Sequence, residues 1–135
     1  MYFQQLSISR LHWDKMQAHV AHNYPIEACG LLAGVNTKVF SVFPVTNSLN
    51  SQTRYRMDAQ EQLSIFLTIE KRNWDLLGIY HSHPNGPPYP SRTDIDEAYY
   101  PGVAQLIWVL NDQIWTCHAF HIYDCKVSQI ELIIE

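Results

Sequence analysis

One apolar stretch of the chain ends at a proline, and this end point constrains the fold more than any other feature. The stretch Asp75–His81 is rich in aliphatic residues and predicts a buried strand, and Ser82, His83 and Pro84 follow it. Proline lacks a backbone N–H and has a fixed φ, so the strand must stop at Pro84. Residues two apart on a strand point to the same face. Both histidines are therefore predicted to project together from the carboxyl end of the strand.

Periodicity divides the rest of the chain into alternating elements. The predicted strands are Phe3–Ile8, Ala28–Val35, Lys38–Val45, Ala104–Leu110, Gln113–Tyr123 and Lys126–Ile134, and the predicted helices are Arg10–His22, one behind Asp58 and one near Arg92–Tyr99. This order predicts an α/β protein with a single mixed β-sheet packed by helices. The length of 135 residues fits one domain, residues 1–135. The strand order stays open at this point.

The helix behind Asp58 has a start signal of its own. Asp58 and Glu61 have the spacing of a capping box, in which each side chain accepts from the other residue's backbone N–H. The apolar face of this helix is predicted from residues at helical spacing: Ala59, Leu63, Phe66 and Leu67.

Composition excludes several classes of protein. The chain is 47% apolar and 16% charged, as in ordinary globular proteins, and has a formal net charge of −4. No block of Lys and Arg is present, so we expect no nucleic-acid binding. Met1–Arg10 does not resemble a signal peptide, and the apolar segment Leu106–Leu110 is far too short to span a membrane. With three cysteines, an odd number, we expect a soluble cytoplasmic protein.

A carboxylate downstream of the two histidines suggests a metal site. Imidazole is a common zinc ligand, and the loop Pro84–Pro90 can turn back and bring Asp94 beside His81 and His83. Two histidines and one carboxylate make three ligands, and a catalytic zinc site keeps its fourth position open. Taken singly, these residues also have plainer explanations. A His-x-His pair alone seldom binds metal, and Ser91 with Asp94 has the spacing of a helix cap.

The whole pattern is more specific than its parts. His-Ser-His-Pro, six residues, then Ser-x-x-Asp, at positions 81–94, resembles the signature of the JAMM (MPN+) metalloprotease family without a departure. The segment Tyr24–Leu32 resembles the region where the family places a distant glutamate, here Glu27, which by itself would be taken for a surface carboxylate. The resemblance covers nearly the whole chain. It implies an α/β fold related to that of the cytidine deaminases.

The resemblance also implies a role for each residue of the pattern. His81, His83 and Asp94 would bind Zn²⁺, which activates water and polarises a carbonyl. Glu27 would take the proton of the attacking water and pass it to the leaving amine. Ser91 would donate a hydrogen bond to the oxyanion.

Three functions are open from the sequence. The first is a zinc metallopeptidase or isopeptidase that cleaves after the C-terminal Gly-Gly tail of a ubiquitin-like or sulfur-carrier protein, as small stand-alone members of the family do. The second is a non-catalytic MPN-type scaffold, although such relatives normally lack metal ligands. The third is a small-molecule amide or thioester hydrolase with the same zinc site. The oligomeric state is not predicted. Three aromatic residues near the site are expected either to shape a groove or to pack: Tyr80, Tyr89 and Tyr99.

The remaining histidines and cysteines are given structural roles. The spacing of Cys117, His118, His121 and Cys125 matches no common zinc motif, and single cysteines do not fit the Pro-Cys-x-x-Cys of zinc deaminases. Cys29 is expected to be a small buried hydrophobe. Surface or packing positions are expected for His12, His19 and His22.

Overall fold

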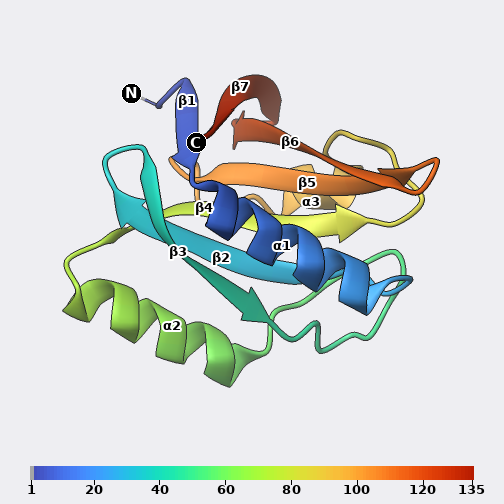
Figure 1. Cartoon of the computed structure of the whole chain (residues 1–135), viewed down its shortest axis with the longest axis horizontal. Coiled ribbons are helices and arrows are strands. Elements are labelled where there is room, and N and C mark those ends of the chain that lie inside the picture. The colour runs from blue at the N-terminus through green and yellow to red at the C-terminus, as the bar shows by residue number, and fades with distance from the viewer. Residues whose placement is uncertain (1) are drawn as a thin grey trace.

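Seven strands and three helices make up residues 2–135, the part of the chain that the computed structural model describes (Figure 1). Their bounds in chain order are β1 Gln5–Ile8, α1 Arg10–Asn23, β2 Cys29–Val35, β3 Lys38–Val45, α2 Ala59–Lys71, β4 Asp75–His83, α3 Arg92–Asp96, β5 Ala104–Asn111, β6 Ile114–Tyr123 and β7 Lys126–Ile134. Within these residues no helix is both long enough and apolar enough to cross a membrane.

The strands form one mixed sheet, as predicted, but the sheet closes on itself. Its order is β1-β3-β2-β4-β5-β6-β7, and β7 returns to pair with β1. The β4–β5 and β1–β7 pairs are parallel, whereas β2–β3, β2–β4, β5–β6 and β6–β7 are antiparallel. The β1–β3 contact consists of one parallel pair, Ser7 with Lys38, so this is the weakest seam of the barrel. The closure was not predicted, and the likeness to cytidine deaminases stays a prediction.

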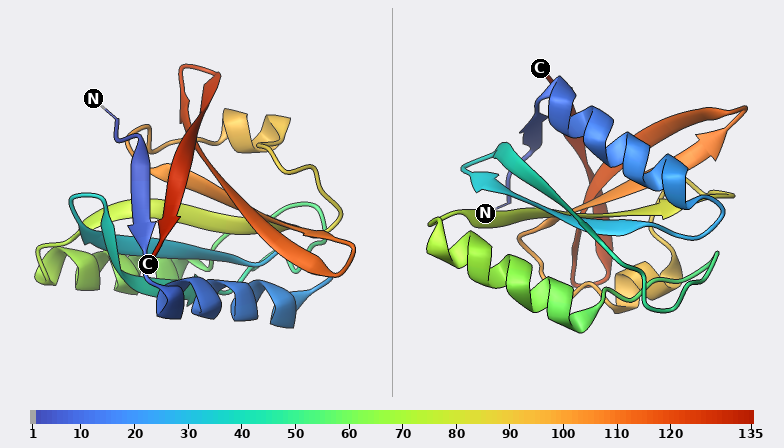
Figure 2. Two further views of the ribbon diagram at one scale, coloured as in Figure 1. Left: turned by 45° about the horizontal axis from the view of Figure 1, so that its top comes forward. Right: turned by 60° about the horizontal axis from the view of Figure 1, so that its bottom comes forward.

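Helices α1 and α2 cover opposite faces of the strands around β2 (Figures 1 and 2). Leu32 of β2 belongs to the core cluster that includes Met16 and Val20 of α1. Its neighbour Leu31 belongs to a second cluster, against which Phe66 of α2 packs. Because both faces of β2 are covered, the strand is apolar on both sides instead of alternating with polar residues.

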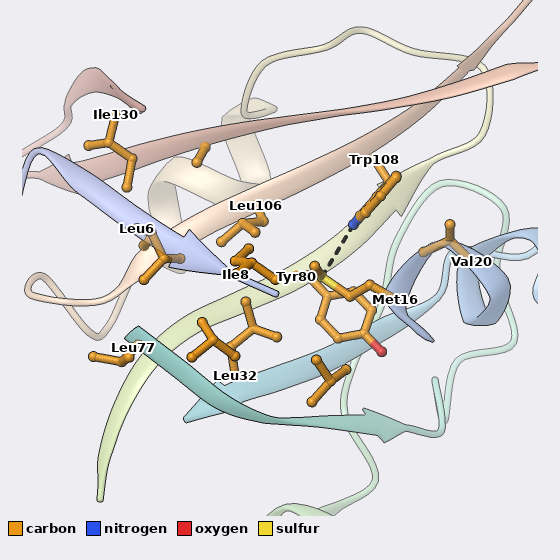
Figure 3. Close-up of a cluster of buried hydrophobic side chains, with 14 of the residues drawn as sticks. Leu6, Ile8, Met16, Val20, Leu32, Leu77, Tyr80, Leu106, Trp108 and Ile130 are labelled. Atoms are coloured by element: carbon orange, nitrogen blue, oxygen red, sulfur yellow. Dashed lines mark hydrogen bonds between the residues drawn. The ribbon is translucent and has the colours of Figure 1, made fainter. Parts of the chain in front are cut away.

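The larger core cluster joins α1 to the middle of the sheet (Figure 3). Trp108 of β5 is fully buried, and its indole N–H donates to the sulfur of Met16 at 3.5 Å. Tyr80 of β4 points into the same cluster, and its hydroxyl lies 2.7 Å from Nδ1 of His19 on α1. Tyr80 is therefore a packing residue and not part of a substrate groove, and His19 is its partner.

Two of the predicted helices differ in detail from the structure. The predicted apolar face of α2 was partly wrong: Leu63 and Leu67 are 59% and 58% exposed, and the side chains that pack inward are Ile65, Phe66 and Ile69. Apolar residues occur on two sides of this helix, so spacing alone could not show which side faces the sheet. Helix α3 ends at Asp96, three residues earlier than expected.

Only half of the predicted capping box at α2 forms. Asp58 accepts from the backbone N–H of Glu61 at 2.9 Å. The Glu61 carboxylate, however, accepts from the backbone N–H of Thr46 at 2.9 Å, while the Asp58 N–H donates to the Thr46 carbonyl at 3.0 Å. Hydrogen bonds with Thr46, just after β3, have replaced the expected bond from the Asp58 N–H to the Glu61 carboxylate.

Gly30 provides a test of this packing. It pairs with Tyr80 across β2 and β4, and a Cβ at position 30 would overlap the Tyr80 ring. We expect Gly30→Ala to lower the free energy of unfolding by about 1–3 kcal/mol, since the buried ring cannot move aside. Gly102→Ala is the matched control: its Cβ would meet only Tyr2, at 3.9 Å, and should change stability by less than about 0.5 kcal/mol. Equal denaturant midpoints for the two variants would contradict this packing.

Candidate metal centre

His81 and His83 lie at the carboxyl end of β4 and face the same side of the sheet, as their spacing predicts. Both are buried, and their Nε2 atoms are 3.0 Å apart. Ser82 lies between the two histidines and Tyr80 lies before them, and both side chains point to the opposite side of the sheet. There Tyr80 joins the core under α1. Because side chains alternate along the strand, the packing residues of β4 lie on one face and its two histidines lie on the other.

The loop after β4 returns and places Asp94 between the two histidines. Asp94 Oδ2 lies 3.2 Å from Nε2 of His81 and 3.1 Å from Nε2 of His83. The same oxygen accepts the backbone N–H of Ser91 at 2.8 Å, and the Ser91 hydroxyl accepts the Asp94 N–H at 3.0 Å. The capping box of α3 is therefore formed, and it also orients the carboxylate toward the histidines.

The three atoms have the spacing that a zinc ion requires. They form a triangle with sides of 3.0–3.2 Å, and a tetrahedral zinc site with bonds of about 2.0 Å has ligand atoms roughly 3.3 Å apart. Two imidazole nitrogens and one carboxylate oxygen are also a donor set that zinc prefers. Among residues 2–135 this is the one group of three such side chains close enough to hold a metal.

Burial and hydrogen bonds shift the pKa values of Asp94 and His83. Burial alone would raise the pKa of Asp94, but hydrogen bonds with His81 and His83 outweigh it and hold the pKa well below its usual range. Asp94 is therefore an anion at neutral pH. Burial lowers the pKa of His83, but the Asp94 carboxylate and the Pro87 carbonyl raise it overall in the absence of metal. Because a histidine binds metal only in its neutral form, protonation of His83 competes with metal binding.

The two imidazoles are held in different ways. Nδ1 of His83 lies 2.8 Å from the Pro87 carbonyl, so Nδ1–H donates and Nε2 is free to bind metal. His81 has no hydrogen-bond partner for its buried Nδ1 within residues 2–135. Instead, the ring of Tyr55 stacks on it, with centroids 4.7 Å apart and planes inclined by 27°. Tyr55 was not predicted from the sequence, because only the fold brings its loop to β4.

Glu27 precedes β2 and lies beside the histidine pair. Ala28 and Ser82 exchange two hydrogen bonds, and Cys29 pairs with His81, so the same antiparallel register places Glu27 opposite His83. The side chain is only 4% exposed. Burial raises the pKa of Glu27 to about 7, with a smaller lowering by His83. A carboxyl group with this pKa can both take up and release a proton near neutrality.

Asn47 fixes the backbone around Glu27, a role that was not predicted from the sequence. Its Nδ2 donates to the carbonyls of Glu27 and Arg54, both at 3.0 Å. Its Oδ1 accepts the backbone N–H groups of Leu49 and Arg56, both at 3.1 Å. All four hydrogen-bonding positions of one amide are used. The residue thereby joins the start of β2 to the loop that carries Tyr55.

Glu27, Ser91 and Asp94 line one cavity of about 430 Å³, between the loop before α2 and helix α3. Because Ser91 Oγ already accepts the Asp94 N–H, its own hydrogen is free to donate, and no acceptor for it lies within hydrogen-bonding distance in residues 2–135. A cavity of about 590 Å³ is lined by the Pro87 loop and the β5–β6 hairpin, and none of the five predicted site residues lines it.

His121, His118 and Cys29 contact residues outside the three-residue cluster. Nε2 of His121 lies 2.8 Å from the Phe3 carbonyl, and His118 contacts Thr116 at 3.3 Å. Cys29 is buried, its thiol lies 3.5 Å from the Val45 carbonyl, and burial raises its pKa to about 12. Such a thiol is not a nucleophile at neutral pH.

Comparison with known proteins identifies the family of this chain and several similar proteins. Residues 9–123 match the family described as prokaryotic homologs of the JAB domain. A desampylase of Haloferax volcanii is 36% identical over 110 residues, which cover 76% of this chain and 79% of the relative. The CysO-cysteine peptidase of Mycobacterium tuberculosis is 41% identical over 90 residues, 65% of this chain and 62% of that protein. The solution structure of a Desulfitobacterium hafniense protein has a TM-score of 0.86 and 33% identity, and covers 96% of this chain and 92% of that one.

Metal content is the direct test of the three-atom cluster. We expect about one zinc per chain in the wild type after metal is added and the excess removed, and none in His83→Ala, because two remaining ligands hold zinc poorly. His118→Ala is the matched control and should keep its zinc, since this histidine contacts Thr116 and is not part of the three-residue cluster. Elemental analysis on folded, monodisperse samples makes the measurement. Equal zinc in wild type and His83→Ala would place the metal elsewhere.

The burial of Glu27 predicts a pH dependence of stability in metal-free protein. Its pKa is about 7 when folded and near 4.5 when unfolded, so folding disfavours the ionised form. Wild type should therefore lose stability relative to Glu27→Gln as pH rises from about 4.5 to about 7, with no further change above that range. Thermal unfolding of both proteins with a chelator, at pH 5 and pH 8, measures the difference. A constant difference would mean that Glu27 is not desolvated.

Proposed function

Because the chain belongs to the family of prokaryotic homologues of the JAB domain, we propose that it is a zinc-dependent metallopeptidase. It hydrolyses the amide bond after the C-terminal Gly-Gly tail of a ubiquitin-like or sulfur-carrier protein. The observation that carries the proposal is the convergence of His81 Nε2, His83 Nε2 and Asp94 Oδ2 within 3.0–3.2 Å of one another, beside the buried carboxyl of Glu27.

His81, His83 and Asp94 hold the metal in this proposal. When bound, zinc supplies a Lewis acid that lowers the pKa of water and polarises the substrate carbonyl. The Pro87 carbonyl and the Tyr55 ring keep the two imidazoles in place, so the ligand atoms need little reorganisation.

Glu27 is the general base and then the general acid. It accepts the proton of the attacking water and delivers it to the nitrogen of the leaving amine. The Asn47 amide and the β2–β4 pairing hold its backbone, so that the carboxyl stays at the edge of the cavity. Ser91 is the oxyanion donor, because its hydroxyl hydrogen is uncommitted and the residue lines the same cavity. One such donor is typically worth about 3 kcal/mol in the transition state.

The relatives support a substrate of the carrier-protein class. Two of them are named desampylase and CysO-cysteine peptidase, and the match with the first covers most of both chains. A Gly-Gly tail suits a buried site because glycine allows the backbone to approach closely. Three unpaired cysteines fit a reducing compartment, and we place the protein in the cytoplasm on that ground.

Removal of the Glu27 carboxylate tests the mechanism. Glu27→Gln keeps the size of the side chain and leaves the metal ligands intact, so zinc content should match the wild type. Cleavage of a carrier protein with a C-terminal extension after Gly-Gly should fall by at least about a hundredfold, because the proton acceptor is lost. Turnover measured by mass spectrometry of the released tail, with zinc content determined on the same sample, gives both numbers.

The same assay separates the other functions. Zinc bound without cleavage of any carrier would favour a non-catalytic scaffold. Equal turnover of short unrelated amides and intact carriers would favour a small-molecule hydrolase. A Glu27→Gln variant as active as wild type would show that another group moves the proton.

A further inference from the structure

Two arginines that the mechanism does not use line the proposed catalytic cavity. Arg54 and Arg56 flank Tyr55 in the loop before α2, and all three line the cavity that holds Glu27, Ser91 and Asp94. The ion pairs of residues 2–135 involve His81, His83 and Arg92, so neither Arg54 nor Arg56 has a carboxylate within 4.0 Å. The protein has only nine Lys and Arg and a net charge of −4, which makes two unpaired guanidinium groups in one cavity unusual for this chain.

The backbone that carries these arginines is rigid. Asn47 accepts the N–H of Arg56 and donates to the carbonyl of Arg54, and Ser48 donates a further hydrogen bond, from its hydroxyl, to the Arg56 carbonyl at 3.0 Å. An isolated bridge pairs Asn47 with Met57. The two guanidinium groups are therefore presented from a fixed stretch of chain, although their side chains are exposed and free to move.

The charges that face this part of the cavity leave a positive excess. Apart from Glu27 and Asp94, which the mechanism employs, the one acidic residue in the lining is Glu97 at the end of α3. Two guanidinium groups against one carboxylate give a net charge of +1. A site of this kind attracts an anionic group and repels a cationic one.

The volume and lining of the cavity indicate which part of the substrate lies there. Its volume of about 430 Å³ falls in the range of pockets that hold drug-sized ligands, roughly 300–1,000 Å³. Its lining includes the proposed catalytic residues and also Gln62 of α2 and Gln105 of β5. A cavity of this volume with polar side chains in its lining is large enough for several residues of extended peptide, and larger than one small leaving group needs.

We propose that this cavity receives the C-terminal tail of the carrier protein, and that Arg54 and Arg56 select tails with an acidic side chain just upstream of Gly-Gly. The inference rests on the proposed peptidase function and adds the charge of the preferred substrate. Arginine is suited to this role because its planar fork matches a carboxylate with two parallel hydrogen bonds.

The test uses the zinc-loaded full chain and one carrier protein with three tails. The two residues before Gly-Gly are both Glu, both Gln or both Lys, and kcat/KM is measured for each tail at low salt and at 0.5 M salt. We expect the order Glu, Gln, Lys, with about a twofold to fivefold drop at each step at low salt. The differences should shrink at 0.5 M salt, because exposed charges are screened.

Variants assign the preference to the two arginines. In the double variant Arg54→Ala/Arg56→Ala the three tails should be cleaved at similar rates, and in Arg54→Glu/Arg56→Glu the Lys tail should become the best. Arg92→Ala is the matched control, because Arg92 is exposed, pairs with Asp96 and does not line the cavity, so it should keep the wild-type order.

Other outcomes would overturn the inference and are distinct from failure of the proposed function. Equal rates for the three tails in wild type, or a preference for Glu that survives the double variant, would remove the role of the arginines while leaving the peptidase intact. A preference for a cysteine over a cysteinamide leaving group that depends on the arginines would show that they bind the leaving group instead. No cleavage of any tail would count against the peptidase itself.

Discussion

The pairing of the start of β2 with the end of β4 is the interaction on which the site depends. Ala28 and Ser82 exchange hydrogen bonds of 2.8 and 3.0 Å across 54 residues of sequence, and the register continues through Cys29 and His81. This register places Glu27 opposite His83. A shift of one residue would turn the histidines into the core under α1, so the buried faces of both strands maintain the geometry of the site.

A single carboxylate oxygen connects the two histidines to helix α3. Oδ2 of Asp94 contacts both imidazoles and also caps α3 through the Ser91 N–H. Ser91 and Asp94 can therefore cap α3 while Asp94 also faces the two histidines. From the sequence alone, a helix cap and a metal site were alternative explanations for these residues. The cap also leaves the Ser91 hydroxyl hydrogen free, which makes its oxyanion role in our proposal chemically reasonable.

The loop before α2 connects the catalytic residues to the substrate in our proposal. Asn47 uses all four of its hydrogen-bonding positions to hold Glu27 on one side and the Arg54–Arg56 segment on the other. Tyr55, in the same segment, stacks on His81. The proposed base, one proposed metal ligand and the charged wall of the cavity are therefore positioned by the same short piece of chain, and none of these links is visible in the sequence.

The sequence by itself determined the local chemistry of this protein. Pro84 had to end the strand, His81 and His83 had to share a face, and Ser91 and Asp94 had to cap a short helix, because each of these rules acts between neighbouring residues. Only the tertiary structure decided that the sheet closes, that Tyr80 packs under α1 while Leu63 and Leu67 remain exposed, and that Asn47 and Tyr55 support the site. These outcomes depend on strand pairing and on burial between segments that are distant in the sequence. The packing of the whole sheet decides both, and neither produces a periodic pattern in the sequence of these residues.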